Sequence, residues 1–281
     1  MSASHLRAAL ELVRPLNILL TFGSVLLGGW IAGDELTSSL ILAALSASAI
    51  AAGGYAHNDV HDLEVARISH RARPIPSGQI SGRAATWISV GCDRSGLGLT
   101  ILLSPLCQAA ALAILISLIL YNQILKTQPL VGNALVGLIG GAPFVYGGFA
   151  VHHWSPSLLP GALAALFHFT REIVKDLQDV DGDAVHSAHT LAIWLGARGT
   201  QAIISLLLLI LVIAIPLPAF LGMVGSGYLL VSLPLCGLLL LTLVTVLQAD
   251  THQDLAFPSR LLKAGMLVGI LAFLVDRLFV S

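Results

Sequence analysis

Two short segments of this largely apolar chain gather acidic side chains that could bind a metal ion. In the first, residues 58–78, Asn58, Asp59 and Asp62 are spaced by three and four residues. If this stretch is helical, their oxygens can share one face. Carboxylate and amide oxygens are the hard ligands that Mg²⁺ prefers, with water and substrate phosphate completing its shell. We therefore predict metal ligands at these three positions.

The second segment, residues 171–183, repeats the pattern. Asp176, Asp179 and Asp183 again lie three and four residues apart, so one face of a helix can carry all three carboxylates. Acidic residues are scarce in this chain, which has only 15 Asp and Glu residues among 281. Their concentration in two short segments predicts a second set of metal ligands here.

Basic side chains flank both segments. Arg73 follows the first acidic group, and Arg171 and Lys175 lie among the acids of the second. Such cations can hold phosphate oxygens while a metal bridges the carboxylates. By position and charge, we predict that they and Lys126 bind phosphate groups of a substrate. The carboxylates predicted to act in catalysis through the metal are Asp59, Asp62, Asp176 and Asp179.

A plainer interpretation stands beside this one. Acids at the ends of membrane helices are often solvated residues that pair with nearby arginines. One such cluster would favour that interpretation. Two clusters with the same spacing, both predicted on one side of a membrane, favour metal binding.

The composition places the chain in a lipid environment. Of its residues, 56% are hydrophobic and only 10% are charged, and buried charge is costly in lipid. The formal net charge of −1 gives no reason to expect a nucleic-acid partner. The three cysteines lie in apolar stretches without the spacing of a metal site or a disulfide framework.

Nine apolar stretches are long enough to cross a bilayer, which takes about 20 residues. We predict an all-α membrane helix bundle in which these spans surround a central apolar chamber, forming a single domain over residues 1–281. The spans lie near residues 16–33, 38–56, 84–103, 106–122, 130–150, 157–175, 200–218, 223–247 and 261–280. An alternative merges residues 95–120 into one span and leaves eight.

The basic residues decide between nine and eight spans, because cytoplasmic loops collect Lys and Arg. With nine spans, every Lys and Arg except Arg94 and Arg277 falls on the side of the N-terminus. With eight, the second acidic segment would move to the opposite side. We therefore predict a multi-pass protein of the cell membrane, with the N-terminus and the loops at 57–83 and 176–198 in the cytoplasm.

At the acidic segments the sequence resembles the UbiA family of intramembrane prenyltransferases. The family's first motif, Asn-Asp-x-x-Asp-x-x-x-Asp followed by Arg-Pro-x-Pro, is matched at residues 58–62 and 73–76, and its second Asp series at residues 176–183. The resemblance extends over nearly the whole chain and includes the Arg-Pro-Leu-Asn stretch that ends at Asn17, which implies a substrate-binding role there. The last Asp of the first motif is missing, because Ala66 takes its place.

The resemblance implies a Mg²⁺-dependent enzyme. Two Mg²⁺ ions would bridge the acidic clusters and a prenyl diphosphate, and the allylic cation formed on ionisation would alkylate an acceptor. Residues 126–141, 171–183 and 189–196 most resemble the members that transfer a geranylgeranyl group to geranylgeranylglyceryl phosphate for membrane ether lipids. Other members of the family prenylate aromatic acceptors in quinone synthesis, and this alternative stays open.

The competing class is an ion-coupled transporter, which would use intramembrane acids as ion sites. Transporter sites usually lie near the bilayer midplane. Here the acids are predicted at the cytoplasmic ends of the spans, and the charges deep in the spans are Asp93 and Arg94. This placement favours the enzyme.

Overall fold

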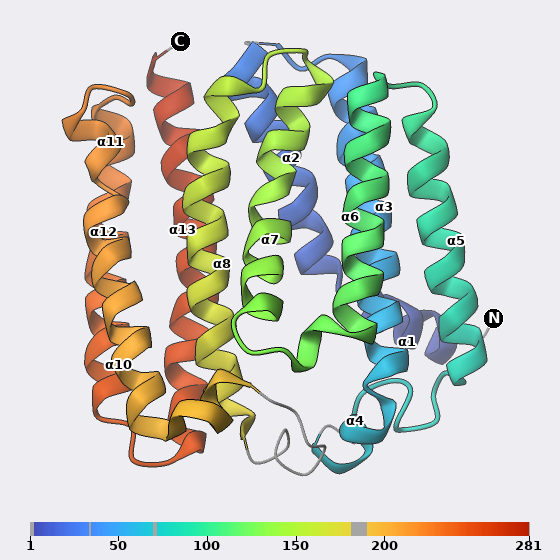
Figure 1. Ribbon diagram of the computed structural model, residues 1–281. Helices are drawn as coiled ribbons and strands as arrows, with labels where there is room; N and C mark the ends of the chain where they lie inside the picture. Colours follow the sequence, from blue (N-terminus) through green and yellow to red (C-terminus); the bar gives the residue numbers. More distant parts are fainter. Residues whose placement is uncertain (1–2, 34, 70–71, 181–189, 281) are drawn as a thin grey trace. The chain divides into compact units, whose positions relative to one another are not determined.

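The computed structural model describes residues 3–33, 35–69, 72–180 and 190–280, and every regular element in these ranges is a helix (Figure 1). The predicted all-α class is confirmed. The α-helices are α1 (Ala3–Val13), α2 (Pro15–Gly33), α3 (Ser38–His61), α4 (Leu63–Ser69), α5 (Gly82–Thr100), α6 (Pro105–Gln123), α7 (Val131–Ala150), α8 (Leu158–Gln178), α10 (Leu191–Ala214), α11 (Leu217–Phe220), α12 (Ser226–Leu247) and α13 (Ala256–Val280). The short 3₁₀ helices are η1 (Leu125–Thr127), η2 (Ser155–Ser157) and η3 (His252–Leu255).

Nine of the described helices have 19 to 25 residues, and they lie at the nine predicted spans. Within the described residues, 6 helices are long and apolar enough to cross a membrane by length and composition alone. The other three, α5, α8 and α13, carry charged residues such as Asp93, Lys175 and Lys263. The chain is therefore a multi-pass membrane protein, and the central chamber stays a prediction.

Helix boundaries agree with the predicted spans at α6 and differ from them at α3 and α10. Ser104 accepts a hydrogen bond from the backbone N–H of Cys107, and Pro105 opens α6, so residues 95–120 do not form one span. α3 continues five residues past its predicted end at 56, and the first acidic residues belong to its last turn. α10 begins at Leu191 rather than near 200, with a kink at Gly196, whose φ of 68° suits glycine.

The chain divides into two compact units. One comprises Met1–Leu125 and Pro143–Leu158, and the other comprises Lys126–Ala142 and Leu159–Ser281. The first acidic segment belongs to the first unit and the second to the other. That residues 1–281 form one domain therefore stays a prediction.

In the first unit, α3 packs closely on α5 through small residues. Ser89 donates a hydrogen bond to the carbonyl of Gly53 at 2.9 Å, and Ser46 donates to the carbonyl of Gly96 at 2.8 Å. A methyl group added at Gly96 would meet the Ser46 carbonyl at 2.9 Å. Small residues and hydroxyl bonds of this kind hold helices together in lipid, where apolar burial between helices gives little. This packing fixes the α3 end that carries the acids.

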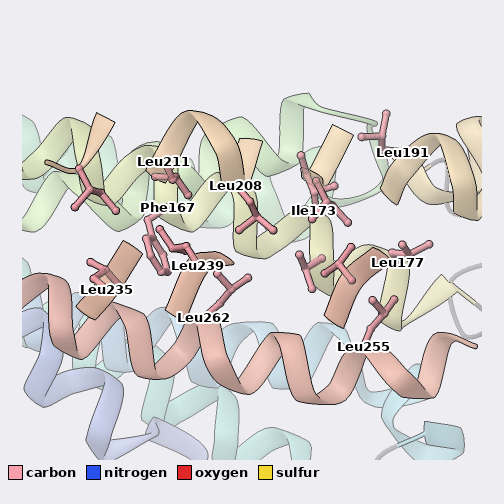
Figure 2. Close-up of a cluster of buried hydrophobic side chains, with 14 of the residues drawn as sticks. Phe167, Ile173, Leu177, Leu191, Leu208, Leu211, Leu235, Leu239, Leu255 and Leu262 are labelled. Atoms are coloured by element: carbon pink, nitrogen blue, oxygen red, sulfur yellow. The ribbon is translucent and has the colours of Figure 1, made fainter. Parts of the chain in front are cut away.

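In the second unit, α8, α10, α12 and α13 share one apolar core (Figure 2). Phe167 of α8 and Leu239 of α12 lie in it, together with Leu208 of α10 and Leu262 of α13. This core packs against α8 and thereby supports the helix that carries the second acidic segment.

The N-terminal half of α7 packs against α8 through glycines. A methyl group added at Gly137 would meet the carbonyl oxygen of Ala165 at 2.8 Å, and one added at Gly141 would collide with the carbonyl oxygen of Gly161. The two backbones can approach only because these positions lack side chains.

Candidate active site

The last turn of α3 carries an amide–carboxylate pair. The side-chain amide of Asn58 donates a hydrogen bond to a carboxylate oxygen of Asp62. Asp62 ends the helix, with its backbone N–H bonded to the carbonyl of Asn58 at 2.9 Å. The predicted helical face for these two residues is therefore present. The amide and carboxylate oxygens form a small set of hard ligands suited to Mg²⁺.

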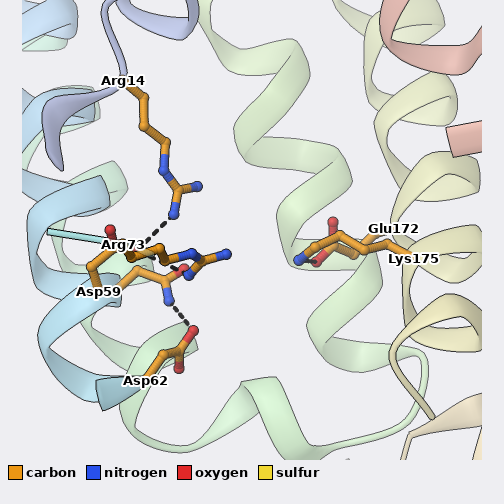
Figure 3. Close-up of polar contacts among 7 residues, drawn as sticks. Arg14, Asp59, Asp62, Arg73, Glu172 and Lys175 are labelled. Atoms are coloured by element: carbon orange, nitrogen blue, oxygen red, sulfur yellow. Dashed lines mark hydrogen bonds and ion pairs between the residues drawn. The ribbon is translucent and has the colours of Figure 1, made fainter. Parts of the chain in front are cut away.

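Asp59 lies in a different setting. Its carboxylate oxygen Oδ1 accepts a hydrogen bond from Arg14 at 2.7 Å and another from Arg73 at 3.4 Å (Figure 3). Asp59 is only 6% exposed, whereas the two arginine side chains are 32% and 33% exposed. The carboxylate that was predicted to bind metal is thus held between two guanidinium groups in this unit.

The two arginines are placed by short backbone features. Arg14 joins α1 to α2 with a φ of 57°, which is unusual for a residue other than glycine, and its guanidinium lies over the ring of Tyr55 at 5.0 Å. Arg73 begins a compact turn in which its carbonyl accepts from the N–H of Ser77 at 3.0 Å and Gly78 has a φ of 77°. The Arg-Pro-x-Pro stretch at residues 73–76 therefore forms part of a compact turn.

The end of α8 carries a second amide–carboxylate pair. Asn133, near the start of α7, donates a hydrogen bond to Asp176 at 2.7 Å. Lys175, the residue before Asp176, lies 3.8 Å from the mostly buried carboxylate of Glu172, one turn earlier in α8 (Figure 3). A carboxylate is here held by an amide from one helix beside a cation from its own helix.

The remaining predicted residues are placed as follows. Asp179 follows the end of α8, with its N–H bonded to the carbonyl of Lys175 at 2.9 Å, and Asp183 lies outside the described residues. Asn17 is half-buried in the first turn of α2, and Lys126 lies in η1. Arg171 of α8 has a buried Nε without a hydrogen-bond partner among the described residues.

A model of the UbiA prenyltransferase family matches residues 21–263. The chain belongs to this family. The match covers both acidic segments, most of α2, every long helix from α3 to α12 and the first two turns of α13, whereas α1 lies outside it.

The similarity to individual members of the family extends over nearly the whole chain. Digeranylgeranylglyceryl phosphate synthase of Methanopyrus kandleri is 37% identical over 273 residues, which are 97% of this chain and 100% of that protein. The synthase of Natronomonas pharaonis is 36% identical over 279 residues, covering 98% and 99%.

Solved structures of family members have the same fold. A structure of a digeranylgeranylglyceryl phosphate synthase has a TM-score of 0.77 at 28% identity, covering 98% of this chain and 99% of that one. A UbiA homologue from Archaeoglobus fulgidus, bound to DMAPP and Mg²⁺, has a TM-score of 0.68 at 16% identity, covering 95% and 99%. The predicted family is confirmed.

The donor set agrees with a Mg²⁺ site that is completed from outside the protein. Among the described residues, no three His, Cys, Asp or Glu side chains lie close enough together to hold a metal ion by themselves. Each amide–carboxylate pair can offer a few oxygens, and Mg²⁺ commonly takes one or two carboxylates with water and substrate phosphates. The oxygens of each pair therefore fit a Mg²⁺ ion that takes its other ligands from water and substrate phosphate.

Two polar residues of this UbiA chain were not among the predicted site residues. Arg14 lies 45 residues from Asp59 in sequence, and Asn133 lies 43 residues from Asp176. Both belong to stretches that resemble the family, and that was the only signal that could have indicated them. Contacts across such distances leave no periodic pattern in a single sequence.

Ala66, which replaces the last Asp of the family's first motif, lies in α4 with only 2% of its surface exposed. Its N–H bonds to the carbonyl of Asp62 at 2.8 Å, so position 66 lies one helical turn beyond Asp62. A side chain there is covered by protein, and an added carboxylate would need a cation or a hydrogen bond.

Proposed function

We propose that this chain transfers a geranylgeranyl group from its diphosphate to geranylgeranylglyceryl phosphate, a step of membrane ether-lipid synthesis. The observation that carries the proposal is the full-length similarity, at 36–37% identity, to two proteins named digeranylgeranylglyceryl phosphate synthases. In this reaction, the allylic C–O bond to the diphosphate breaks and a C–O bond to the acceptor hydroxyl forms. The hydroxyl proton and pyrophosphate are released.

We assign Mg²⁺ as the cofactor. Its proposed ligands in the first unit are Asn58 and Asp62. Those in the second unit are Asp176 and Asp179, with Asp183 as a further ligand outside the described ranges. When bound, Mg²⁺ neutralises the negative charge that develops on the leaving diphosphate. Asp59 belongs to the predicted metal set as well, although two guanidinium groups already occupy one of its oxygens.

The basic residues of α8 and η1 are assigned to the diphosphate. Arg171 has a buried Nε that no described residue satisfies, and an anion would supply the missing acceptor. Lys175 is held by Glu172, and Lys126 adds a further positive charge. Preorganised cations of this kind stabilise the charge of a leaving diphosphate.

We also propose that the N-terminus and both acidic segments are cytoplasmic, because Lys and Arg gather on that side when nine spans are counted. Single cysteines at Ser69 and Ser187, in a background without the native cysteines, test this orientation. Both should stay unlabelled by an impermeant thiol reagent in intact cells and become labelled after permeabilisation. Labelling of either in intact cells would refute the orientation.

The activity is tested by incubating purified protein in detergent with Mg²⁺, geranylgeranyl diphosphate and one acceptor. We expect a digeranylgeranyl product and pyrophosphate with geranylgeranylglyceryl phosphate, and none in excess chelator. Transfer to 4-hydroxybenzoate alone would replace the acceptor class with an aromatic one. Full turnover in chelator would remove Mg²⁺ from the proposal, and no transfer to any acceptor would favour a transport function.

A further inference from the structure

Asp59 and its two arginines form a cluster that the metal hypothesis does not explain. Arg14 comes from the junction of α1 and α2, and Arg73 comes from the turn after α4, yet both donate to the same oxygen of Asp59 (Figure 3). With one carboxylate and two guanidinium groups, the cluster carries a formal charge of +1. Its carboxylate is buried, whereas about a third of each arginine side chain is exposed.

Toward the described residues, each of the two arginine side chains uses one of its nitrogens in hydrogen bonding. A guanidinium has five N–H donors. Two guanidinium groups held on one carboxylate, each about a third exposed, can offer planar N–H forks to a ligand. Such forks match the oxygens of a phosphate group.

The arrangement is held in place before any ligand arrives. Arg14 keeps a left-handed backbone conformation, which costs on the order of 1 kcal/mol or more and persists only where surrounding contacts enforce it. Its guanidinium also lies over Tyr55, while Arg73 is fixed by a proline turn. The strained backbone of Arg14, its contact with Tyr55 and the turn at Arg73 hold two partly exposed guanidinium groups in fixed positions. Such preorganised cations indicate that this cluster binds an anion.

Electrostatics disfavours a metal ion at Asp59. A divalent cation bound to its carboxylate would lie within a few ångströms of two positive guanidinium groups, and like charges at that distance repel strongly. A phosphate monoester, by contrast, carries up to two negative charges and would balance the excess positive charge. A diphosphate that is already coordinated to Mg²⁺ has less need of this cluster.

We propose that Arg14 and Arg73 bind the phosphate group of the acceptor lipid, and that Asp59 is a positioning residue that aligns the two guanidinium groups rather than a metal ligand. This assignment rests on the proposed function, because it presumes an acceptor that carries a phosphate monoester. Both substrates carry phosphate groups that the two arginines could bind. The kinetic tests therefore distinguish the phosphate of the acceptor lipid from the diphosphate of the prenyl donor.

Steady-state kinetics of single variants separate these roles. For Arg14→Gln and Arg73→Gln we expect the KM for geranylgeranylglyceryl phosphate to rise about 10- to 100-fold, as loss of a charged hydrogen bond implies. The KM for geranylgeranyl diphosphate should change less than about threefold by the same reasoning. Arg7→Gln removes an exposed arginine that pairs with Glu11 and serves as the matched control.

The positioning role of Asp59 is tested against Asp62. Asp59→Asn should raise the acceptor KM while leaving the Mg²⁺ concentration for half-maximal rate unchanged, whereas Asp62→Asn should raise that concentration. Arg14→Lys keeps the charge without the fork and should recover only part of the affinity. A raised Mg²⁺ requirement in Asp59→Asn with an unchanged acceptor KM would overturn the proposal, as would a raised KM for the diphosphate alone in the arginine variants.

A binding measurement tests variants whose turnover is too slow for steady-state kinetics. Glycerol 1-phosphate should raise the Tm of the purified wild-type protein in chelator, and Arg14→Gln and Arg73→Gln should abolish this shift while Arg7→Gln keeps it. If this Tm shift is seen but no prenyl group is transferred to the glyceryl phosphate, the proposed function is wrong and phosphate binding is still supported. If transfer occurs but the acceptor KM is unchanged in Arg14→Gln and Arg73→Gln, this inference is wrong while the proposed function is still supported.

Discussion

The ends of α3 and α8 carry the same kind of polar pair in different settings. At α3 the pair is local, since Asn58 and Asp62 lie one turn apart on one helix. At α8 it joins two helices, since Asn133 of α7 holds Asp176. A local pair forms whenever its helix forms, whereas a pair between helices depends on how they pack.

The cations show the opposite arrangement. The α8 end has Lys175 within its own helix, three residues from Glu172. The α3 end takes Arg14 and Arg73 from segments distant in sequence, and both converge on Asp59. Each end therefore has one feature that is visible in the sequence and one that only the folded chain creates. The contrast implies that acidic residues of similar spacing need not have similar roles.

The largest loss of activity is expected when the carboxylate of either amide–carboxylate pair is removed. Asp62→Ala and Asp176→Ala should each lower kcat/KM by at least about 100-fold, or ~3 kcal/mol, because each removes a carboxylate proposed to hold Mg²⁺. Asp250→Ala changes an exposed acid of the second unit and should behave as wild type. A large loss in only one of the two variants would show that the ends are not equivalent metal sites.

Removal of the amide that joins α7 to α8 should have a smaller effect. Asn133→Ala leaves Asp176 in place but removes the hydrogen bond that it accepts from α7, and loss of such supporting groups typically changes activity by roughly 10- to 100-fold. The measurement is kcat/KM at saturating Mg²⁺, with the exposed Gln123→Ala as control. Wild-type activity of Asn133→Ala would mean that Asp176 is oriented by its own helix.

Ala66→Asp tests whether the α3 end can be made more like the family's full motif. Because position 66 is 2% exposed, the new carboxylate should lower the Tm in chelator, and Mg²⁺ should restore more stability to this variant than to wild type. The maximal rate should change less than about tenfold, or ~1.4 kcal/mol. An equal Mg²⁺ response in both proteins would place position 66 away from the metal.

The smallest effect is expected at Glu64, an acidic residue two positions before Ala66. In the structure its side chain is 73% exposed and pairs with Arg67 at 2.7 Å. Exposed pairs of this kind contribute little, with a median near 0–1 kcal/mol. Glu64→Gln should therefore keep the rate and the Mg²⁺ requirement within about twofold of wild type, and a larger rise in the Mg²⁺ requirement would make Glu64 a ligand.

Local patterns predicted much of this architecture because helices in lipid obey simple rules of length and charge. The nine long helices, the position of Ala66 one turn after Asp62 and the proline turn at Arg73 all follow from neighbours in sequence. The role of Asp59 could not be predicted in the same way. Its spacing places it with the metal ligands, but the partners of its carboxylate come from residues 14 and 45 positions away.

The glycines of α7 affect how loss of activity in substituted variants of this protein should be interpreted. Gly141 lies eight residues, or about 12 Å along the helix, from Asn133. A methyl group at Gly141 would collide with the backbone of α8 and shift the register of the two helices. The amide of Asn133 would then slide out of reach of Asp176. A variant two turns from Asn133 can thus lose activity with every proposed metal ligand unchanged. A screen that scores turnover alone would count such a position as catalytic.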